Sequence, residues 1–279
     1  MNVAIAGGTG FLGRALGRAL AGDGHSIVVL KRGSTDGVDG SDVVVNLAGE
    51  SIAGRRWSTA HKRRILDSRI DTTRRLADAI SGASRPPRVF VSASAVGYYG
   101  PRGDEAVTEE TPAGRDFMAT VCVRWESEAM RVAERTRVVC LRSGLVLERD
   151  GGALPPMLPP FWFGVGGPVG SGRQYWSWIQ RDDWVALVRW AIATPAATGS
   201  INATAPNPVT NREFARALGR AMHRPSFVPA PAFALRLLLG EMADALVLTG
   251  QRVMPAKAER LGFVFRYPEL DAALASIFP

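Results

Sequence analysis

The sequence predicts an α/β protein: a doubly wound parallel sheet with a small, mainly helical C-terminal cap. Short runs rich in valine and isoleucine alternate with helical patterns through the first half of the chain, and this alternation is typical of a parallel sheet between helix layers. The apolar runs at residues 27–30 and 43–45 show no polar alternation, which indicates strands that are buried on both faces.

Each element of the first half follows from these patterns. The predicted strands cover residues 2–6, 26–30, 42–46, 88–92 and 137–142, and the predicted helices cover residues 11–21, 59–79 and 116–134. Residues 31–41 are rich in glycine and aspartate and are barely long enough to return to a parallel strand, so we expect no full helix there.

The second half changes in texture after residue 150, where glycine- and proline-rich loops surround an aromatic cluster. Helical patterns then cover residues 182–194, 211–222, 231–248 and 268–277. We therefore predict a sheet domain from residues 1–150 and about 171–200, and a cap from residues 151–170 and 201–279. The aromatic residues would line a substrate pocket or form the core of the cap.

Composition narrows the classes of function. The net charge is +8, but the basic residues are scattered and are not interleaved with aromatic residues, so we expect no nucleic-acid partner. The longest apolar stretch, residues 229–239, is short and contains Arg236, so we expect no membrane segment. Two cysteines without clustered histidines indicate neither a disulfide framework nor a metal site. With no signal-peptide pattern at the start, a cytoplasmic location is expected.

A glycine-rich turn joins the first predicted strand to the first predicted helix. Residues 7–13 read Gly-Gly-Thr-Gly-Phe-Leu-Gly, a spacing that lets the backbone turn tightly and touch a pyrophosphate at the helix N-terminus. This indicates a Rossmann-type dinucleotide site. The cofactor-binding residues expected in this turn are Gly7, Thr9, Gly10, Phe11, Leu12 and Gly13.

The end of the second predicted strand indicates which dinucleotide binds. An NAD-selective protein usually places a carboxylate there to bind the ribose hydroxyls, whereas this chain has Lys31 and Arg32. A carboxylate would repel a 2′-phosphate, and a guanidinium binds it. The expected cofactor is therefore NADP(H).

Several further motifs carry a resemblance to a known family. The chain contains Asn-Leu-Ala-Gly-Glu from residue 46, Ser-Ala-Ser-Ala-Val-Gly-Tyr-Tyr-Gly from residue 92 and Gly-Gln-Arg-Val-Met-Pro from residue 250. With the glycine turn, these motifs resemble the extended short-chain dehydrogenases/reductases, and more closely their atypical "epimerase family protein" subgroup, which is nucleoside-diphosphate-sugar epimerase-like and has a short C-terminal domain. The resemblance runs nearly end to end.

The resemblance implies further site residues. Ser94 matches the serine that hydrogen-bonds a substrate carbonyl, with Ser92 as the second choice and as a cofactor neighbour. Leu47, Ala48 and Gly49 match the segment that lines the adenine ribose and pyrophosphate. Arg69 stands where extended members have an asparagine near the cofactor, and Val146 matches a position at the nicotinamide end.

One departure from the family leaves the reaction open. Extended members use a Tyr-x-x-x-Lys pair as general acid and base, but on the helix from residue 117 the corresponding positions hold Met118 and Cys122, or Cys122 and Glu126. Cys122 would more often pack than react, Tyr98 or Tyr99 could replace the proton donor, and Glu126 could pair with an arginine.

Three functions remain open at this point. The first is an NADP(H)-dependent oxidoreductase acting on an unidentified small molecule, and the second is a non-catalytic NADP(H)-responsive sensor or scaffold. A nucleotide-sugar epimerase, with Arg142 and Arg173 helping to bind the nucleotide, is weaker than either. The sequence leaves the oligomeric state, monomer or dimer, undecided.

Overall fold

The computed structural model describes residues 1–279 and contains the predicted parallel sheet. Its six strands lie in the order β2-β1-β3-β4-β6-β11, and every neighbouring pair is parallel. The strands are β1 (Asn2–Ala6), β2 (Ser26–Leu30), β3 (Val43–Asn46), β4 (Val89–Ala95), β6 (Arg137–Ser143) and β11 (Gly199–Ala203). The predicted fold class is confirmed.

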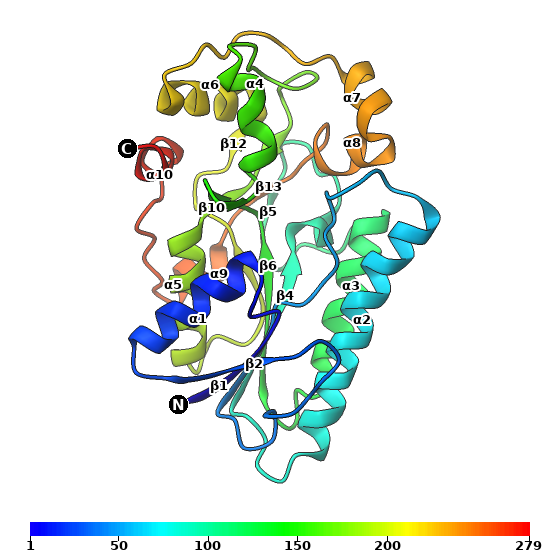
Figure 1. Ribbon diagram of the computed structural model, residues 1–279, viewed down its shortest axis with the longest axis vertical. Helices are drawn as coiled ribbons and strands as arrows, with labels where there is room; N and C mark the ends of the chain where they lie inside the picture. Colours follow the sequence, from blue (N-terminus) through cyan, green and yellow to red (C-terminus); the bar gives the residue numbers. More distant parts are fainter.

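Helices cover both faces of this sheet (Figure 1). Helices α1 (Phe11–Gly22) and α5 (Arg181–Ala193) lie on one face, and α2 (Thr59–Gly82) and α3 (Phe117–Met130) lie on the other. The strand pattern explains the two layers, because successive residues point to opposite faces: Val43 and Val45 belong to the core under α1 and α5, while Val44 belongs to the core under α2 and α3.

Strand β2 differs from the prediction, because it is not buried on both faces. Val28 and Val29 are 41% and 46% exposed. The strand is at the edge of the sheet, and residues 31–41 form turns without a helix, as expected from their length. With one neighbouring strand and no crossover helix, Val28 and Val29 stay partly exposed, whereas Leu30 is buried and Ile27 packs against the core under α1.

The cap has its own hydrophobic core at the end of the molecule that is uppermost in Figure 1. Its helices are α4 (Leu158–Trp162), α6 (Asn211–Met222), α7 (Ala232–Leu239), α8 (Glu241–Leu246) and α10 (Leu270–Ile277), and the 3₁₀ segment η2 (Pro155–Met157) precedes α4. Phe161, Trp176 and Trp178 are buried in this core, whereas Trp162 and Phe163 are exposed. The aromatic cluster is therefore mainly cap core.

Short strands join the cap to the main sheet. They are β5 (Ala106–Val107), β7 (Leu145–Glu148), β8 (Gly151–Gly152), β9 (Tyr175–Trp176), β10 (Trp178–Gln180), β12 (Val209–Thr210) and β13 (Arg252–Val253). The predicted boundary at residue 200 falls within β11, and the division into domains stays a prediction. Ala258 of α9 (Ala256–Arg260) belongs to the core of the main sheet.

Two predicted helices differ most from the structure, and the other predicted helices agree with it to within three residues at each end. The helix expected at residues 231–248 is two helices, α7 and α8, separated by Gly240 at φ +63°. This left-handed conformation interrupts helical hydrogen bonding, and glycine adopts it without steric cost. The helix expected at 116–134 begins at Phe117, after the Asp116 cap, and ends at Met130.

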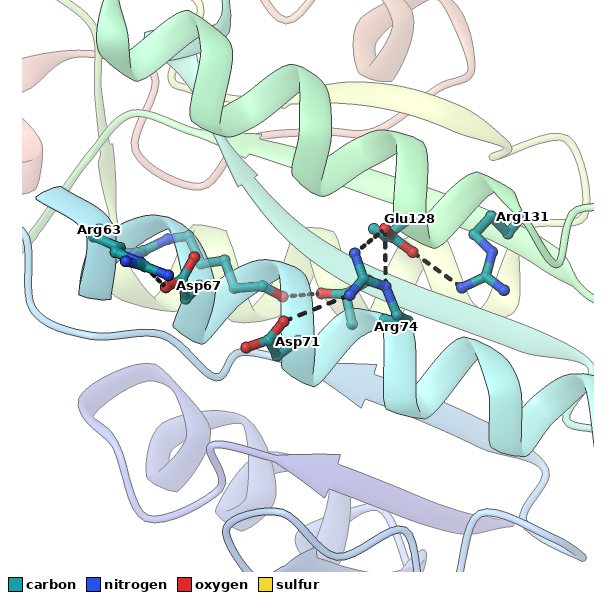
Figure 2. A network of polar contacts seen from close by, with 8 residues as sticks. Arg63, Asp67, Asp71, Arg74, Glu128 and Arg131 are labelled. Carbon is teal, nitrogen blue, oxygen red and sulfur yellow. Dashed lines mark hydrogen bonds and ion pairs between the residues drawn. The ribbon is translucent and has the colours of Figure 1, made fainter.

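The outward surface of α2 and α3 carries a chain of ion pairs (Figure 2). Arg74 contacts Asp71 on its own helix at 3.6 Å and Glu128 of α3 at 2.8 Å. Glu128 also pairs with Arg131 at 3.0 Å. These contacts tie the two helices together on their solvent side.

Candidate functional site

The glycine turn has the geometry that a pyrophosphate site needs. Gly7 is at φ +78°, and a Cβ there would lie 2.8 Å from the carbonyl carbon of Leu47. A Cβ on Gly13 would overlap the carbonyl oxygen of Gly7. Glycine is therefore required at both positions, one for the contact between the segments after β1 and β3 and one for the contact between the turn and α1.

The first turn of α1 is left open for an anion. Gly10 is its N-cap residue and offers no side-chain hydrogen bond to the helix, and no acidic residue lies in the first turn. The amide groups of this turn therefore keep their hydrogen-bonding capacity and the positive end of the helix dipole. The turn also lies where the chain switches direction across the sheet, between β1 and β3, which is the ligand-binding position in doubly wound folds.

A cavity of about 340 Å³ lies next to this turn. It brings together five of the residues predicted from the sequence, Phe11, Leu12, Arg69, Ser94 and Val146. Its other lining residues are Ile52, Ala95, Met118, Val121, Cys122, Trp125, Ser143, Gly144, Leu145, Gly152 and Ala153. The glycine turn and the cavity form one continuous site at the carboxyl ends of the strands.

A second cavity, of about 360 Å³, lies at the opposite edge of the sheet. Met1, Val43 and Val89 line it; Val43 and Val89 begin β3 and β4, and Met1 directly precedes β1. Ligands of doubly wound sheets bind at the carboxyl ends, so the cavity beside the glycine turn is the candidate site.

Ser94 is held by a buried carboxylate. Its hydroxyl donates to Oε1 of Glu126 at 2.6 Å, and Glu126 is only 8% exposed. Two nitrogens of Arg142 donate to the two oxygens of Glu126, each at 2.8 Å. Because its proton is directed to Glu126, Ser94 presents oxygen lone pairs to the cavity, whereas the family resemblance implies donation to a carbonyl.

The arginine of this pair extends the network toward the cap. Burial alone lowers the pKa of Arg142, but the hydrogen bonds with Glu126 outweigh it, and the net shift is upward. Arg142 also donates to the Tyr99 hydroxyl at 2.9 Å, and that hydroxyl donates to Asn202 at 2.7 Å. Burial raises the pKa of Tyr99 to about 12, so this phenol stays protonated.

The two candidate positions for the tyrosine of the absent Tyr-x-x-x-Lys pair lie in the cavity. Met118 and Cys122 both line it. Burial, with a smaller effect of the nearby Glu126, raises the pKa of Cys122 to about 12. A neutral thiol and a thioether therefore replace the phenol, and neither serves as an acid or base near neutral pH.

Arg69 lines the same cavity and has no carboxylate partner. Its guanidinium donates to the backbone oxygens of Glu50 at 3.1 Å and Ile65 at 3.0 Å. It lies over the Trp125 ring, 5.1 Å from the ring centroid. The residue is 7% exposed, and burial lowers its pKa.

The remaining predicted residues lie around or outside this cavity. Lys31 and Arg32 are exposed just after β2, and Leu47 and Ala48 contact the glycine turn. A Cβ on Gly49 would lie 3.0 Å from Cζ of Arg69. Ser92 is fully buried in β4 and does not line the cavity, because it lies two residues before Ser94 along the strand.

Some site residues were missed by the sequence reasoning. Trp125, Ile52 and Ser143 line the cavity, and Ser143 accepts a hydrogen bond from Nε1 of Trp184 at 2.9 Å. The sequence features that could have identified Trp125 and Ser143 were the dipeptides Trp-Glu at residues 125–126 and Arg-Ser at residues 142–143. Asp183 of α5 does not line the cavity: it accepts backbone hydrogen bonds from Arg266 and Tyr267 at 2.9 and 2.8 Å, which gives it a structural role.

Neither a metal site nor a membrane-spanning helix is present in the structure. No group of histidine, cysteine, aspartate and glutamate side chains has the arrangement of a metal site. No helix combines the length and apolar character that a bilayer crossing requires.

The chain resembles several known proteins along nearly its whole length. It is 37% identical to the human "Epimerase family protein SDR39U1", over 99% of each chain. It is 43% identical to a homologue from Arabidopsis thaliana described as chloroplastic, over 99% of this chain and 86% of that protein. The Bacillus subtilis protein YfhF is 37% identical, over 99% of this chain and 98% of that protein.

Solved structures agree with these relatives. The crystal structure of human SDR39U1 with NADPH superimposes with a TM-score of 0.95, at 37% identity and 99% coverage of each chain. A nucleoside-diphosphate sugar epimerase from Corynebacterium glutamicum gives a TM-score of 0.81 at 34% identity, covering 100% of this chain and 58% of that chain.

Family models account for both parts of the molecule. Residues 230–277 match a domain of unknown function, DUF1731, which corresponds to the expected short C-terminal domain. Residues 3–203 match the NAD dependent epimerase/dehydratase family. This match spans the sheet, the glycine turn and the cavity, and the chain therefore belongs to the NAD dependent epimerase/dehydratase family.

Proposed function

We propose that this chain binds NADP(H) across the carboxyl edge of its sheet and acts as an oxidoreductase on a small molecule in the cavity. One observation carries the proposal: the open N-terminus of α1 leads directly into the cavity, which Phe11 and Leu12 of that helix line together with Ser94. The NADPH of the human relative supports the choice of cofactor.

The strand order supports an orientation for the cofactor. Lys31 and Arg32 follow β2 at one edge of the sheet, and the cavity is bounded by β4 and the segment after β6, on the other side of β1. A 2′-phosphate on Lys31 and Arg32 leaves the pyrophosphate at Gly7–Gly13 and the nicotinamide in the cavity. Bound there, the cofactor supplies hydride chemistry.

The side chains of the cavity would position a substrate oxygen. The Ser94 hydroxyl donates a hydrogen bond to Glu126. Its oxygen lone pairs would therefore accept a hydrogen bond from a substrate hydroxyl. Ser143 accepts from Trp184, so its own proton is free for a substrate carbonyl. The other walls are largely apolar and include Ile52, Val121 and Leu145, which favours a small substrate with one polar group.

Cofactor binding is tested by titrating the purified protein with NADPH and NADH. We expect tighter binding of NADPH, and Arg32→Ala should lose at least about tenfold in NADPH affinity while NADH affinity stays unchanged, because a charge-assisted contact to the 2′-phosphate is removed. Absence of binding to either nucleotide would overturn the proposal.

Turnover is tested with NADPH deuterated at C4 and a cell extract. Mass spectrometry should find deuterium in a small molecule in the presence of the protein, and not with a Gly13→Val variant, whose side chain would overlap the turn. If the label stays on the cofactor in every fraction, the protein has no oxidoreductase activity in that extract, and the second candidate function is favoured.

That second candidate is an NADP(H)-responsive sensor or scaffold without turnover. Met118 and Cys122 favour it, since they stand in the cavity where a catalytic phenol is expected. Such a protein would bind a partner with different affinity in the nucleotide-bound and nucleotide-free states. Equal partner capture with and without saturating NADPH would count against it.

A nucleotide-sugar epimerase remains the weakest proposal. The apolar cavity offers few groups to bind sugar hydroxyls, and Arg142, which was expected to help bind the nucleotide, is engaged by Glu126 instead. The cytoplasmic location, the monomeric or dimeric state and the lack of nucleic-acid or membrane partners stay predictions from the sequence.

A further inference from the structure

The cavity contains one buried cation that contacts no carboxylate directly. Arg69 donates only to backbone carbonyl oxygens and lies against the Trp125 ring. The two carboxylates of its surroundings have arginines of their own: Glu50 pairs with Arg55 at 3.3 Å, and Glu126 pairs with Arg142 at 2.8 Å. The guanidinium of Arg69 therefore has no carboxylate in direct contact at the cavity wall, and Glu50 acts on it only through space.

This charge lies at the wall of the cavity in which the nicotinamide is proposed to bind, and it also lies beside Gly49, in the segment expected to line the pyrophosphate. Arg69 shares the cavity with Ser94, Cys122 and Trp125, whereas the cations expected to bind the 2′-phosphate follow β2 at the far edge of the sheet. A ring bound in this cavity would face Arg69, which is only 7% exposed to solvent. Charges interact strongly under such conditions, because solvent screening is weak.

We propose that Arg69 makes this pocket bind reduced NADPH more tightly than oxidised NADP⁺. The inference rests on the proposed function and adds a direction to it. The oxidised nicotinamide ring carries a positive charge and the reduced ring is neutral, so a nearby unpaired cation repels one form and tolerates the other. Reduction of a substrate would then be favoured by release of NADP⁺, and a sensor would report the reduced form.

The test compares the affinities of NADPH and NADP⁺, with NADPH followed by its fluorescence and NADP⁺ by competition. For the unmodified protein we expect NADPH to bind at least about tenfold more tightly, which corresponds to about 1.4 kcal/mol. The NADH and NAD⁺ pair should show a similar ratio, since the 2′-phosphate lies far from Arg69. Equal affinities of the two redox forms would overturn the inference and leave NADP(H) binding intact.

Two variants locate the effect. Arg69→Met removes the charge and keeps a side chain that covers Trp125. The affinities of this variant for NADPH and NADP⁺ should differ by no more than about threefold. Arg69→Lys keeps the charge and should keep the preference. If Arg69→Met weakens NADPH and NADP⁺ by the same factor, Arg69 contacts a phosphate, and the inference is wrong.

A matched control separates charge at the nicotinamide from charge at the ribose. Arg32→Ala should weaken NADPH and NADP⁺ equally and leave their ratio unchanged. Circular dichroism and thermal melting verify that each variant is folded. If Arg69→Met does not fold, the ratios of the unmodified protein and Arg69→Lys still decide: a ratio near one in either contradicts the inference. Failure of the unmodified protein to bind any dinucleotide would instead overturn the proposed function.

Discussion

Two carboxylates on α3, only two residues apart, form ion pairs in opposite environments. Glu126 points inward, where its pair with Arg142 has side-chain exposures of 10% and 4%. Glu128 lies on the solvent side with a side-chain exposure of 17%, and its arginine partners Arg74 and Arg131 are about half exposed, at 46% and 48% (Figure 2). Two glutamates on one helix therefore form one buried ion pair and one set of ion pairs on the solvent side.

The difference shows where this protein depends on an ion pair. Outside, water screens the charges, and such pairs add little to stability. Inside, each charge has lost its hydration and depends on its partner, so loss of one partner leaves an uncompensated charge. The inner pair also holds Ser94 at the cavity, which links stability to the site.

The largest effect is expected for Glu126→Gln. The substitution leaves Arg142 charged and buried, so the free energy of unfolding should fall by about 3–5 kcal/mol. Urea denaturation measures the change. A loss below about 1 kcal/mol would mean that water reaches Arg142, and that the inner and outer pairs do not differ as described.

A double replacement sharpens the comparison. In Glu126→Leu with Arg142→Met no charge is left behind, and stability should recover by about 1–3 kcal/mol relative to Glu126→Leu alone. Arg142→Met alone completes the double-mutant cycle. If the two single losses simply add in the double variant, Glu126 and Arg142 are not coupled.

Glu128→Gln should have a smaller, pH-dependent effect. Hydrogen bonds from Arg74, and then from Arg131, lower the pKa of Glu128 below its ordinary value of 4.5. A lowered pKa stabilises the folded state above the unfolded pKa, and the contribution is lost as the pH falls through the folded value. The variant should be less stable by under about 1 kcal/mol at pH 7, and the difference should vanish in acid. A difference that grows as the pH falls would contradict this assignment.

The smallest effect is expected for Arg131→Ala. Arg131 pairs with Asp78 and Glu128 on the solvent side, and its loss should not change the thermal midpoint measurably in high salt, where exposed pairs are screened. A melting series with and without added salt measures this. A salt-independent loss would show that this outer pair resembles the inner one.

The sequence predicted the parts of the fold that depend on local signals. Helix α6 begins and ends at the predicted residues 211 and 222, and its start has a local cause, since Thr210 and Glu213 cap it reciprocally. The split between α7 and α8 was not predicted, because apolar residues continue on both sides of Gly240. The exposure of β2 was missed, since an edge strand can carry the same residues as a central one.

The candidate site was predictable in part for a similar reason. The segments that follow β1, β3 and β4 end at one edge of a parallel sheet, so the glycine turn, Leu47 and Ser94 could be placed near one another. Ser92 was included because positions two residues apart on a strand share a face, and the sequence does not show which of them lies nearer the end of the sheet. The partner of Glu126 depends on the rotation of α3 about its axis, which no local pattern gives.

The bare outer edge of β2 has a consequence for any variant made there. Its unpaired backbone groups and the half-exposed Val28 and Val29 are a template for strand addition by another molecule. Lys31 and Arg32 come directly after β2, and charged residues that flank an exposed strand oppose the addition of further strands. One dipeptide would thus both select the nucleotide and keep the protein from self-association, so a change of cofactor preference at Lys31 and Arg32 carries a cost in solubility.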